Sequence, residues 1–553
     1  MGAMDPQELI AALQEPSAWP EPPATVEHLQ THISIVFFVG EHVYKVKKEL
    51  SLPFLDASTL ERRRALCEEE VRLNARLAGD TYLGVVPIVR PIAHGASGGL
   101  RVGGEGEVAE WAVHMRRLPS ERMLDQLLAR GEVDNRLMNA IAERLARFHA
   151  SADTGTGVDE YGDPDAVRKN VLDNFAQTEG FVGQTFPAAV HAFLRERAET
   201  RLADLADVLQ RRVDDGRVRD GHGDLHGSNV CYLAPPKGAP EDADGQLVIY
   251  DCIEFSDAFR CGDVACDLAF LAMDLDHRGF HAFGAYLAHR YAAHANDPEL
   301  EELLPFYKGY RAMVRAKVAS LLSTEAEVPA KQRDQARRTA LSYTHLASAY
   351  ELPPALILMC GLPACGKTWV AERVAPFLDP CVLSSDVVRK RMAGIPLGKR
   401  HKGAYEDGIY SPEAKRRTYA TLLERGLEAV AAGRTAVVDA TFGTRAFRAP
   451  YIEAAERLGV PLILVHVHAD EAVIAERMER RAKDPNEASD ATFQVYLAAR
   501  ERFEAPDEMR PEQVVDYNSV DGVPEELGMA VVEARLRAFR ALHGAPLRPT
   551  VEG

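Results

Sequence analysis

Residues 361–368 read Gly-Leu-Pro-Ala-Cys-Gly-Lys-Thr, and this stretch decides the fold of the second half of the chain. It fits the phosphate-binding pattern GxxxxGK[ST] at every fixed position. An apolar run over 355–360 leads into it, and apolar residues at helical spacing follow it. This context predicts a strand before the loop and a helix after it, which is the setting in which the pattern binds phosphate.

Four residues of this loop carry the predicted chemistry. Gly361 and Gly366 let successive backbone N–H groups surround phosphate at the N-terminus of a helix. Lys367 places a positive charge on the β- and γ-phosphate oxygens, and Thr368 offers its hydroxyl to Mg²⁺. We see no NKxD-type guanine signal in the sequence, so we expect ATP with Mg²⁺ as the cofactor.

Two later strands should end beside this loop. The run 381–384 reads as a strand with Asp386 just beyond it and Arg389 three residues later, and the run 435–440 delivers Asp439 to the same edge. Parallel α/β sheets carry their chemistry at the carboxyl ends of the strands, so Asp386 is a candidate base for an incoming hydroxyl. The alternative is that Asp386 only caps the next helix.

Two arginines on a later helix complete the predicted site. The runs 462–467 and 514–517 read as a fourth and a fifth strand. Between them Arg477 and Arg481 stand four residues apart, and they therefore share one helix face. Arginines on a lid beside such a loop commonly neutralise transferring phosphate. A solvated basic face is the alternative.

The segment from 356 to about 508 resembles the 5′-kinase module of polynucleotide kinases and their relatives, including zeta-toxin-like and small-molecule P-loop kinases. The resemblance implies phosphoryl transfer to a hydroxyl. It also implies that Asp386 activates that hydroxyl, that Arg389 binds substrate phosphate, and that the two lid arginines hold the donor phosphates. The acceptor stays open: a polynucleotide end, a nucleotide, a sugar or an antibiotic. Basic clusters at 399–402 and 415–417 would suit a nucleic-acid path or plain surface.

The first half of the chain carries a different motif, His-Gly-Asp-Leu-His-Gly-Ser-Asn at 222–229. Asp224 is followed five residues later by Asn229, which is the spacing of a kinase catalytic loop. In such a loop the aspartate accepts the hydroxyl proton and the asparagine binds Mg²⁺. A short apolar strand over 247–250 then ends at Asp251, which is placed like a second metal-binding carboxylate.

This half resembles the aminoglycoside phosphotransferase family over roughly 7–350. The resemblance is carried by the HGDxxxxN loop, by Leu-Ala-Arg-Phe-His at 145–149 and by Gly-Asp-Val-Ala-Cys-Asp-Leu-Ala-Phe at 262–270, in which Asp267 is expected to be structural. It implies a bilobal, protein-kinase-like fold. The residues 31–39 contain no glycine, so the glycine-rich loop that usually covers the phosphates is missing.

A β-hairpin over 34–48 should carry the ATP lysine of this domain. Lys45 and Lys47 alternate with apolar residues and project to the same face of the strand. Lys47 is our preference, because its surroundings fit the family better. Glu70, on a predicted helix over 60–77, is the expected ion-pair partner, and its register is preferred over that of Glu68 and Glu69.

Composition and charge limit the function further. The chain has 553 residues and a formal charge of −18, of which the first 350 residues carry −15. Such an acidic body argues against non-specific nucleic-acid binding by the first half. No apolar run approaches the ~18 residues needed to span a bilayer. The eight cysteines show no CxxC pair, which is typical of free thiols in a reducing cytoplasm, and we therefore expect a cytoplasmic protein.

We therefore predict an α+β kinase-like domain over 7–350, with a small lobe to about 117 and a large lobe from about 118. An α/β P-loop domain over 353–545 follows, with a tail over 546–553, whereas 1–6 resemble a vector-derived scar. The preferred hypothesis is a bifunctional ATP-dependent phosphotransferase acting on small-molecule hydroxyls. The alternatives are a sensory first domain, a 5′-hydroxyl kinase for nucleic-acid ends, and a non-catalytic nucleotide switch.

Overall fold

The computed structural model describes residues 5–52, 55–91, 99–235, 245–326, 328–374, 381–396, 408–483 and 493–543. The chain divides into two compact units, and each is described by itself. The first contains 1–167, 205–274 and 282–304, and the second contains 168–204, 275–281 and 305–553. Among the described helices, five contain residues of both units: α5 (Pro164–Thr178), α6 (Ala188–Asp214), α8 (Val264–His277), α9 (His281–Ala295, through its first residue) and α10 (Leu300–Thr324).

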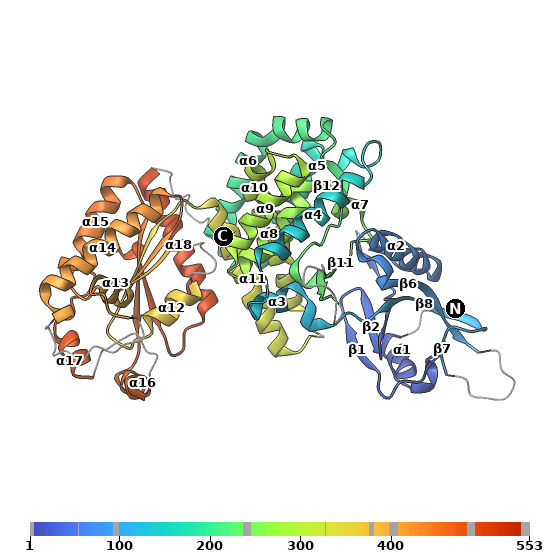
Figure 1. The fold of residues 1–553 in the computed structure, drawn as a ribbon, viewed down its shortest axis with the longest axis horizontal. Coiled ribbons are helices and arrows are strands. Elements are labelled where there is room, and N and C mark those ends of the chain that lie inside the picture. The colour runs from blue at the N-terminus through green and yellow to red at the C-terminus, as the bar shows by residue number, and fades with distance from the viewer. Residues whose placement is uncertain are drawn as a thin grey trace. The chain divides into compact units, whose positions relative to one another are not determined.

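The first unit begins with a six-stranded antiparallel sheet in the order β1-β2-β3-β8-β6-β7 (Figure 1). Its strands are β1 (Glu27–Gln30), β2 (Ser34–Val39), β3 (His42–Lys47), β6 (Tyr82–Arg90), β7 (Arg101–Val102) and β8 (Glu107–Arg116). α1 (Pro6–Leu13) packs on one face and α2 (Leu60–Ala78) on the other. Apolar residues alternate along β3, so both of its lysines lie on the α2 face.

Short hairpins and helices follow this sheet within the first unit. β9 (Val218–Asp220) pairs with β12 (Cys261–Asp263), and β10 (Val230–Leu233) pairs with β11 (Gln246–Ile249). The other elements are β4 (Ser51–Leu52), β5 (Leu55–Asp56), α3 (Leu124–Ala129), α4 (Asn135–Ser151), α7 (Asp257–Arg260), α9 (His281–Ala295) and the 3₁₀ turns η1 (Pro16–Ala18), η2 (Gly79–Thr81), η3 (Ser120–Arg122), η4 (Asp159–Tyr161) and η6 (Gly227–Asn229). The first unit thus has an antiparallel sheet lobe, which is followed by helices and two short strand pairs. This arrangement confirms the predicted kinase-like α+β fold.

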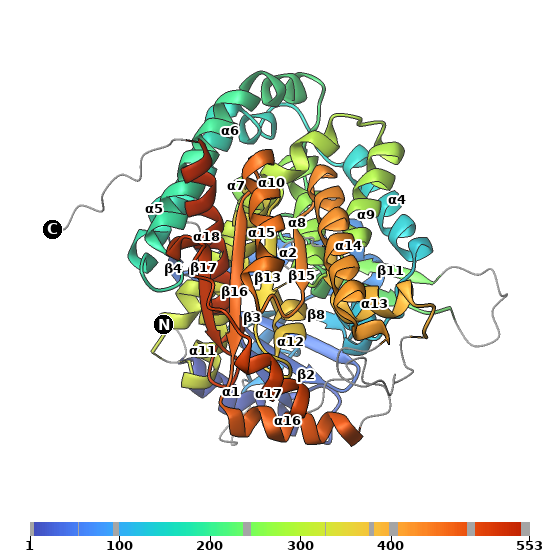
Figure 2. The same cartoon turned by 90° about the vertical axis from the view of Figure 1, so that its left-hand side faces the viewer.

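The second unit contains a five-stranded parallel sheet in the order β14-β15-β13-β16-β17, and Figure 2 labels β15, β13, β16 and β17 within it. The strands are β13 (Leu356–Cys360), β14 (Cys381–Ser384), β15 (Ala436–Asp439), β16 (Leu462–His468) and β17 (Val514–Asn518). Each of the five lies where the sequence predicts a strand, to within one residue. This confirms the predicted P-loop α/β fold.

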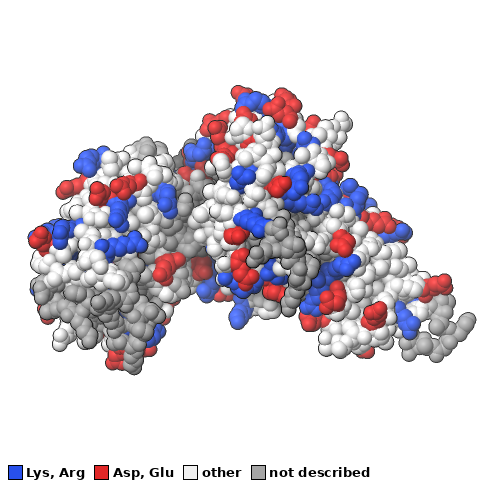
Figure 3. All heavy atoms as spheres, in the orientation of Figure 1, with Lys and Arg blue, Asp and Glu red and all other residues white. Residues whose placement is uncertain are grey.

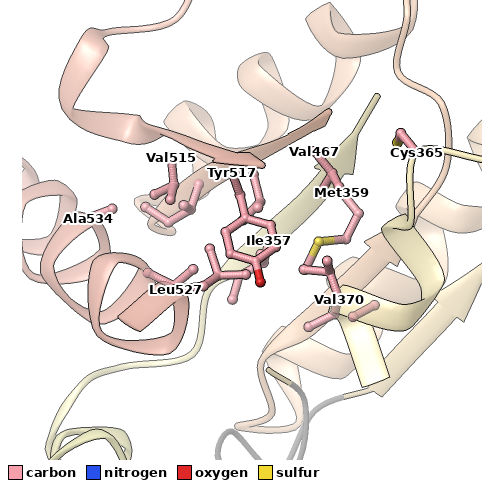
Figure 4. Packing of buried hydrophobic residues seen from close by; sticks show 14 of the residues in the cluster. Ile357, Met359, Cys365, Val370, Val467, Val515, Tyr517, Leu527 and Ala534 are labelled. Carbon is pink, nitrogen blue, oxygen red and sulfur yellow. The ribbon is translucent and has the colours of Figure 1, made fainter. Parts of the chain in front are cut away.

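Helices cover both faces of this sheet, so its strands are buried and almost wholly apolar. One face packs against α12 (Lys367–Val374), α16 (Glu471–Lys483), α17 (Phe493–Glu501) and α18 (Pro524–His543), as the close-up in Figure 4 shows in part. The other face packs against α13 (Ser385–Met392), α14 (Pro412–Ala431) and α15 (Arg445–Leu458). The second unit also contains the turns η5 (Glu179–Phe181), η8 (Gly408–Tyr410) and η9 (Pro511–Gln513).

The expected domain boundary near 349–355 lies between α11 (Ala330–Glu351) and β13, and both elements belong to the second unit. α11 packs along α18, the last helix of the P-loop fold. The division at 350–353 therefore stays a prediction. Within the described residues, no helix is both long enough and apolar enough to cross a bilayer.

A buried ion-pair triad in the first unit gives a test of this fold. Arg212 binds Asp263 and Asp297 through four hydrogen bonds of 2.5–2.9 Å, and all three side chains are almost fully buried. Arg212→Met should lower the free energy of unfolding by about 3–5 kcal/mol, because it leaves Asp263 without its cation and Asp297 with only Arg217, at 3.9 Å. Arg211→Met is the matched control, since the adjacent Arg211 is half exposed and pairs only with Glu299 among the contacts seen here.

Urea unfolding of the full chain measures this effect. In a Trp369→Phe background, the fluorescence of Trp19 and Trp111 reports on the first unit alone. The control should change by less than about 1 kcal/mol. Equal losses for the two variants would show that the triad contributes no more than a surface pair.

Candidate active sites

The first site is built around Glu70, whose side chain is fully buried in α2. Lys45 Nζ lies 3.0 Å from Glu70 Oε1, and Lys47 donates a hydrogen bond to Glu70 Oε2. The neighbouring Glu68 and Glu69 instead pair with arginines of the same helix. Burial alone would raise the pKa of Glu70, but the two lysines outweigh it and lower that pKa. Of the three neighbouring glutamates, Glu70 is therefore the one that contacts the two lysines.

The two lysines differ in their second partner. Lys45 Nζ lies 2.7 Å from Asp251 Oδ1, whereas Lys47 donates to the buried Glu254. Burial opposes the charge of Lys45, but Asp251 and Glu70 outweigh it and hold the pKa of Lys45 well above its ordinary value. Lys45 therefore stands beside the candidate metal carboxylate, and Lys47 is enclosed between two glutamates.

The loop 222–229 connects β9 to β10 and contains η6. His222 is fully buried, and burial lowers its pKa, which keeps the ring neutral. One ring nitrogen lies 3.0 Å from the carbonyl oxygen of Tyr250, and the other accepts from the backbone N–H of Asp224 at 3.3 Å. Asn229 donates to the backbone oxygen of Asp224 at 3.0 Å. These contacts hold Asp224 and Asn229 beside Tyr250, the residue that precedes Asp251.

Two buried carboxylates of α8 accept hydrogen bonds from the backbone of this loop. Asp267 accepts from the backbone N–H groups of His222 at 2.8 Å and Gly223 at 2.9 Å. Asp274 accepts from the N–H of Gly227 at 2.9 Å. Asp267 also lies 3.1 Å from His149 Nε2. The contacts of Asp267 match the structural part expected of it.

The donor set of the first site suits a divalent cation that arrives with a nucleotide. Among the described residues, no group of three or more His, Cys, Asp or Glu side chains forms a ready-made metal cage. Mg²⁺ usually takes one or two protein carboxylates together with phosphate oxygens. Asp251 offers a carboxylate, and Asn229 offers its amide oxygen because its amide nitrogen is turned toward Asp224. The residues present therefore fit Mg²⁺ bound together with ATP.

The second site lies at the carboxyl end of β13. The loop turns sharply at Gly361, where φ is 149°, and a Cβ there would overlap the carbonyl oxygen of Val467. Gly366 also has positive φ, and Ala364 has φ 61°, which is unusual for a residue with a side chain. Lys367 Nζ donates to the carbonyl oxygen of Leu362 at 2.9 Å. The side chain of Lys367 therefore lies against the phosphate-binding loop itself.

Asp439 at the end of β15 contacts this loop, and Asp386 in the first turn of α13 follows the neighbouring strand β14. Thr368 Oγ1 donates to Asp439 Oδ2 at 2.6 Å. Burial raises the pKa of Asp439, while Lys367 and Thr368 act in the opposite direction. Asp386 accepts from Arg389 at 2.7 Å, and the Arg389 guanidinium lies 4.9 Å from the ring centre of Tyr410. Asp386 raises and Arg481 lowers the pKa of Asp439, so both charges act on this sheet edge.

Arg477 is held against the phosphate-binding loop itself. Its guanidinium donates to the backbone oxygen of Cys365 at 3.1 Å and to Ser519 Oγ at 2.8 Å. Ser519 follows β17, and its hydroxyl donates to the same oxygen of Cys365 at 2.5 Å. Arg477 and Ser519 thus hold the backbone of the loop at Cys365. The helical spacing of Arg477 and Arg481 does not predict this contact with Cys365.

Sequence reasoning missed four neighbours of the two sites: Asn74, Tyr82, Glu254 and Ser519. Glu254 stands three residues after Asp251, so its position beside a candidate metal ligand is a signal that sequence alone offers. The other three, Asn74, Tyr82 and Ser519, contact residues far away in the sequence, and those contacts exist only in the folded chain. The basic cluster at 399–402 lies outside the described residues. In the cluster at 415–417, the Lys415 ammonium lies 4.6 Å from the ring centre of Phe447 on α15.

Residues 356–506 match a family model described as an AAA domain. This match covers the whole P-loop motif, helix α13 with Asp386 and strand β15 with Asp439. It confirms the P-loop domain predicted for this part of the chain.

Known proteins are similar to larger parts of the chain. An uncharacterised protein of Mycobacterium tuberculosis (strain H37Rv) is 29% identical over 472 residues, which cover 85% of this chain and 89% of that protein. A gluconokinase structure from Sinorhizobium meliloti is 22% identical, covers 34% of this chain and 97% of its own, and has a TM-score of 0.25. A microcompartment-associated aminopropanol kinase is 15% identical, covers 62% and 97%, and has a TM-score of 0.34.

The contacts of the two β3 lysines predict different effects of their substitution. Lys45→Met should weaken Mg²⁺-ATP binding at the first site by at least about tenfold, because it removes a charge shared with Asp251. Lys47→Met should mainly lower the melting temperature, because Glu70 and Glu254 lose a buried cation between them.

Calorimetry and thermal melting of the full chain, with Lys367→Ala silencing the other site, measure both effects. The opposite pattern, with affinity lost in Lys47→Met alone, would restore the preference for Lys47 that the sequence suggests.

Proposed function

We propose that this protein is an ATP-dependent phosphotransferase with two sites, each moving the γ-phosphate of ATP to an acceptor hydroxyl. The observation that carries the proposal is the meeting of Lys367, Thr368, Asp439 and Asp386 at one edge of a parallel sheet. The first unit supports a second site through Asp224, Asn229, Asp251 and the lysines on Glu70. Two kinase-type folds in one chain support a bifunctional enzyme.

At the first site, Asp224 is the base that accepts the proton of the acceptor hydroxyl. Asn229 and Asp251 offer oxygens to Mg²⁺, and the metal when bound neutralises phosphate charge. Lys45 contacts the phosphates, since it is the lysine beside Asp251. Lys47 neutralises Glu70 and Glu254, and so it keeps Glu70 in place for Lys45.

At the second site, the backbone N–H groups of 361–368 and Lys367 bind the donor phosphates. Thr368 offers its hydroxyl to Mg²⁺, and Asp439 holds that hydroxyl. Asp386 accepts the proton of the acceptor hydroxyl, and Arg389 both orients Asp386 and binds substrate phosphate. Arg481 faces the donor phosphates, whereas Arg477 keeps the loop in shape from the side of Ser519.

The acceptors we propose are small molecules. The acidic body of the chain gives no electrostatic support for tracking a polyanion, and on the face drawn in Figure 3 the Lys and Arg side chains are interspersed with Asp and Glu. A second candidate is a 5′-hydroxyl kinase for polynucleotide ends, with the first unit regulatory. The basic residues of 415–417 on α14 favour it.

If Asp386 is the base of the second site, its substitution should slow acceptor phosphorylation without weakening ATP binding. In a chain whose first site is silenced by Lys45→Met for nucleotide binding and by Asp224→Asn for chemistry, Asp386→Asn should leave ATP affinity within about threefold and lower acceptor phosphorylation by roughly 10²-fold or more. The amide retains the size of the carboxylate and keeps an oxygen in the first turn of α13, but it cannot accept the proton. Lys367→Ala in the same background is the reference for lost nucleotide binding.

A screen with labelled ATP across sugars, amino alcohols, aminoglycosides, nucleosides and 5′-hydroxyl oligonucleotides supplies the acceptor. If ATP affinity and rate fall together in Asp386→Asn, or if neither falls, Asp386 is a helix cap and the base lies elsewhere.

The nucleic-acid alternative makes a separate prediction about salt. Tight backbone tracking releases counterions, so it gives an affinity that falls steeply with salt concentration. We expect no sub-micromolar binding of a single-stranded oligonucleotide at either low or physiological salt. The residues from 351 onward carry 27 basic against 30 acidic side chains, which is too balanced for such binding.

Binding measured at two salt concentrations, alongside 5′-phosphorylation of the same oligonucleotide, decides between the readings. Sub-micromolar affinity with a steep salt slope, lost on charge reversal at Lys415, Arg416 and Arg417, would establish the polynucleotide function instead.

A further inference from the structure

The candidate metal carboxylate of the first site sits on a strained piece of backbone. Asp251 has φ 64°, in the left-handed region that residues with a side chain rarely adopt. Such a conformation costs free energy and persists only where neighbouring contacts hold it. The contacts that hold Asp251 therefore help to decide whether its carboxylate points to where Mg²⁺ and phosphate would bind.

Two side chains of the sheet lobe take up the two successive backbone N–H groups at this turn. Asn74 Oδ1 accepts from the N–H of Cys252 at 2.9 Å, and the hydroxyl of Tyr82 accepts from the N–H of Asp251 at 3.3 Å. Asn74 is 1% exposed and Tyr82 is 8% exposed. A buried N–H that loses its acceptor cannot turn to water, so each of these bonds constrains the turn strongly.

The amide of Asn74 is itself fixed in direction. Its Nδ2 donates to the backbone oxygen of Glu70 at 2.8 Å, within the same helix. A flipped amide would place a donor against the N–H of Cys252 and an acceptor against the carbonyl of Glu70, so only one orientation satisfies both contacts. Asn74 thus links the helix that carries Glu70 to the turn that carries Asp251.

A second residue of α2 holds the other loop of the site. Arg76 donates to the backbone oxygens of Asp220 at 2.8 Å and Gly221 at 2.9 Å, directly before the catalytic loop. Its guanidinium also lies over the ring of Phe148. One helix therefore sets the lysine partner, the metal-carboxylate turn and the entrance to the catalytic loop.

We propose that Asn74 is a positioning residue of the first site, which with Tyr82 holds Asp251 in its left-handed conformation and so sets the affinity for the Mg²⁺ complex of the nucleotide. The proposal rests on the proposed function of that site. Asn74 acts through the backbone of Cys252 and contacts no phosphate. Its removal therefore weakens the Mg²⁺-dependent part of nucleotide binding and leaves the part made by Lys45 in place.

Two variants remove the two acceptors separately. Asn74→Leu retains the volume but neither hydrogen bond, and Tyr82→Phe removes only the hydroxyl. Arg72→Leu is the matched control on α2, because Arg72 is exposed and pairs with Glu69. In the full chain with Lys367→Ala, calorimetry should show that the gain in ATP affinity due to Mg²⁺ falls about tenfold in each variant, while Mg²⁺-free ATP affinity stays within about threefold.

Hydrogen exchange without any ligand tests the positioning directly. Peptides covering 250–254 should exchange at least about tenfold faster in Asn74→Leu and Tyr82→Phe than in the parent and the Arg72→Leu control. Unchanged exchange in both variants overturns the proposal whether or not ATP binds. Faster exchange in a protein whose parent binds no nucleotide at millimolar ATP supports the positioning and refutes the proposed function of the site. Equal losses of Mg²⁺-free and Mg²⁺-dependent affinity also overturn it, since they indicate a general structural defect.

Discussion

A buried carboxylate needs a cation and hydrogen bonds in place of water, and both sites of this protein are built on that constraint. At the first site the buried Glu70 and Glu254 share Lys45 and Lys47 with Asp251, which is partly exposed. At the second, the buried Asp439 depends on Thr368 and Lys367, and the partly exposed Asp386 depends on Arg389. A phosphate group brings further negative charge to each place. The cations therefore have to be shared between the carboxylates and the ligand, which is why each lies at a junction of several elements.

Much of this arrangement can be predicted from sequence, because it follows from periodicity and spacing. The five strands of the P-loop sheet are apolar runs bounded by turns, and buried parallel strands carry that pattern. Glu70 can be selected over its neighbours because helical register relates it to Leu77. The motif loops bring Asp224 and Asn229, and Lys367 and Thr368, close together within a few residues of chain.

The remainder depends on contacts between elements far apart in the sequence. Lys45 and Lys47 share a face of β3, so period-2 reasoning treats them alike, and only the positions of Asp251 and Glu254 distinguish them. Helical spacing places Arg477 and Arg481 on one face, but it does not say that Arg477 meets the backbone of Cys365. The left-handed conformation of Asp251 cannot be predicted from the sequence either, because glycine is the residue that usually adopts it and none stands at this position.

The packing of α11 on α18 bears on how the second unit can be separated from its neighbours in the chain. His345 on α11 is buried against Gly528 on α18, where any side chain would collide with its ring, and burial lowers the pKa of His345 to about 3. Arg535 on α18 donates to the carbonyl oxygen of Pro353, and burial lowers its pKa to about 10. A cut at 350–353 would remove α11 from α18, expose both surfaces, and place a chain end beside the carbonyl group that Arg535 binds. The P-loop sheet and α11 therefore belong to one compact unit, in which α11 packs on the helix that covers one face of the sheet.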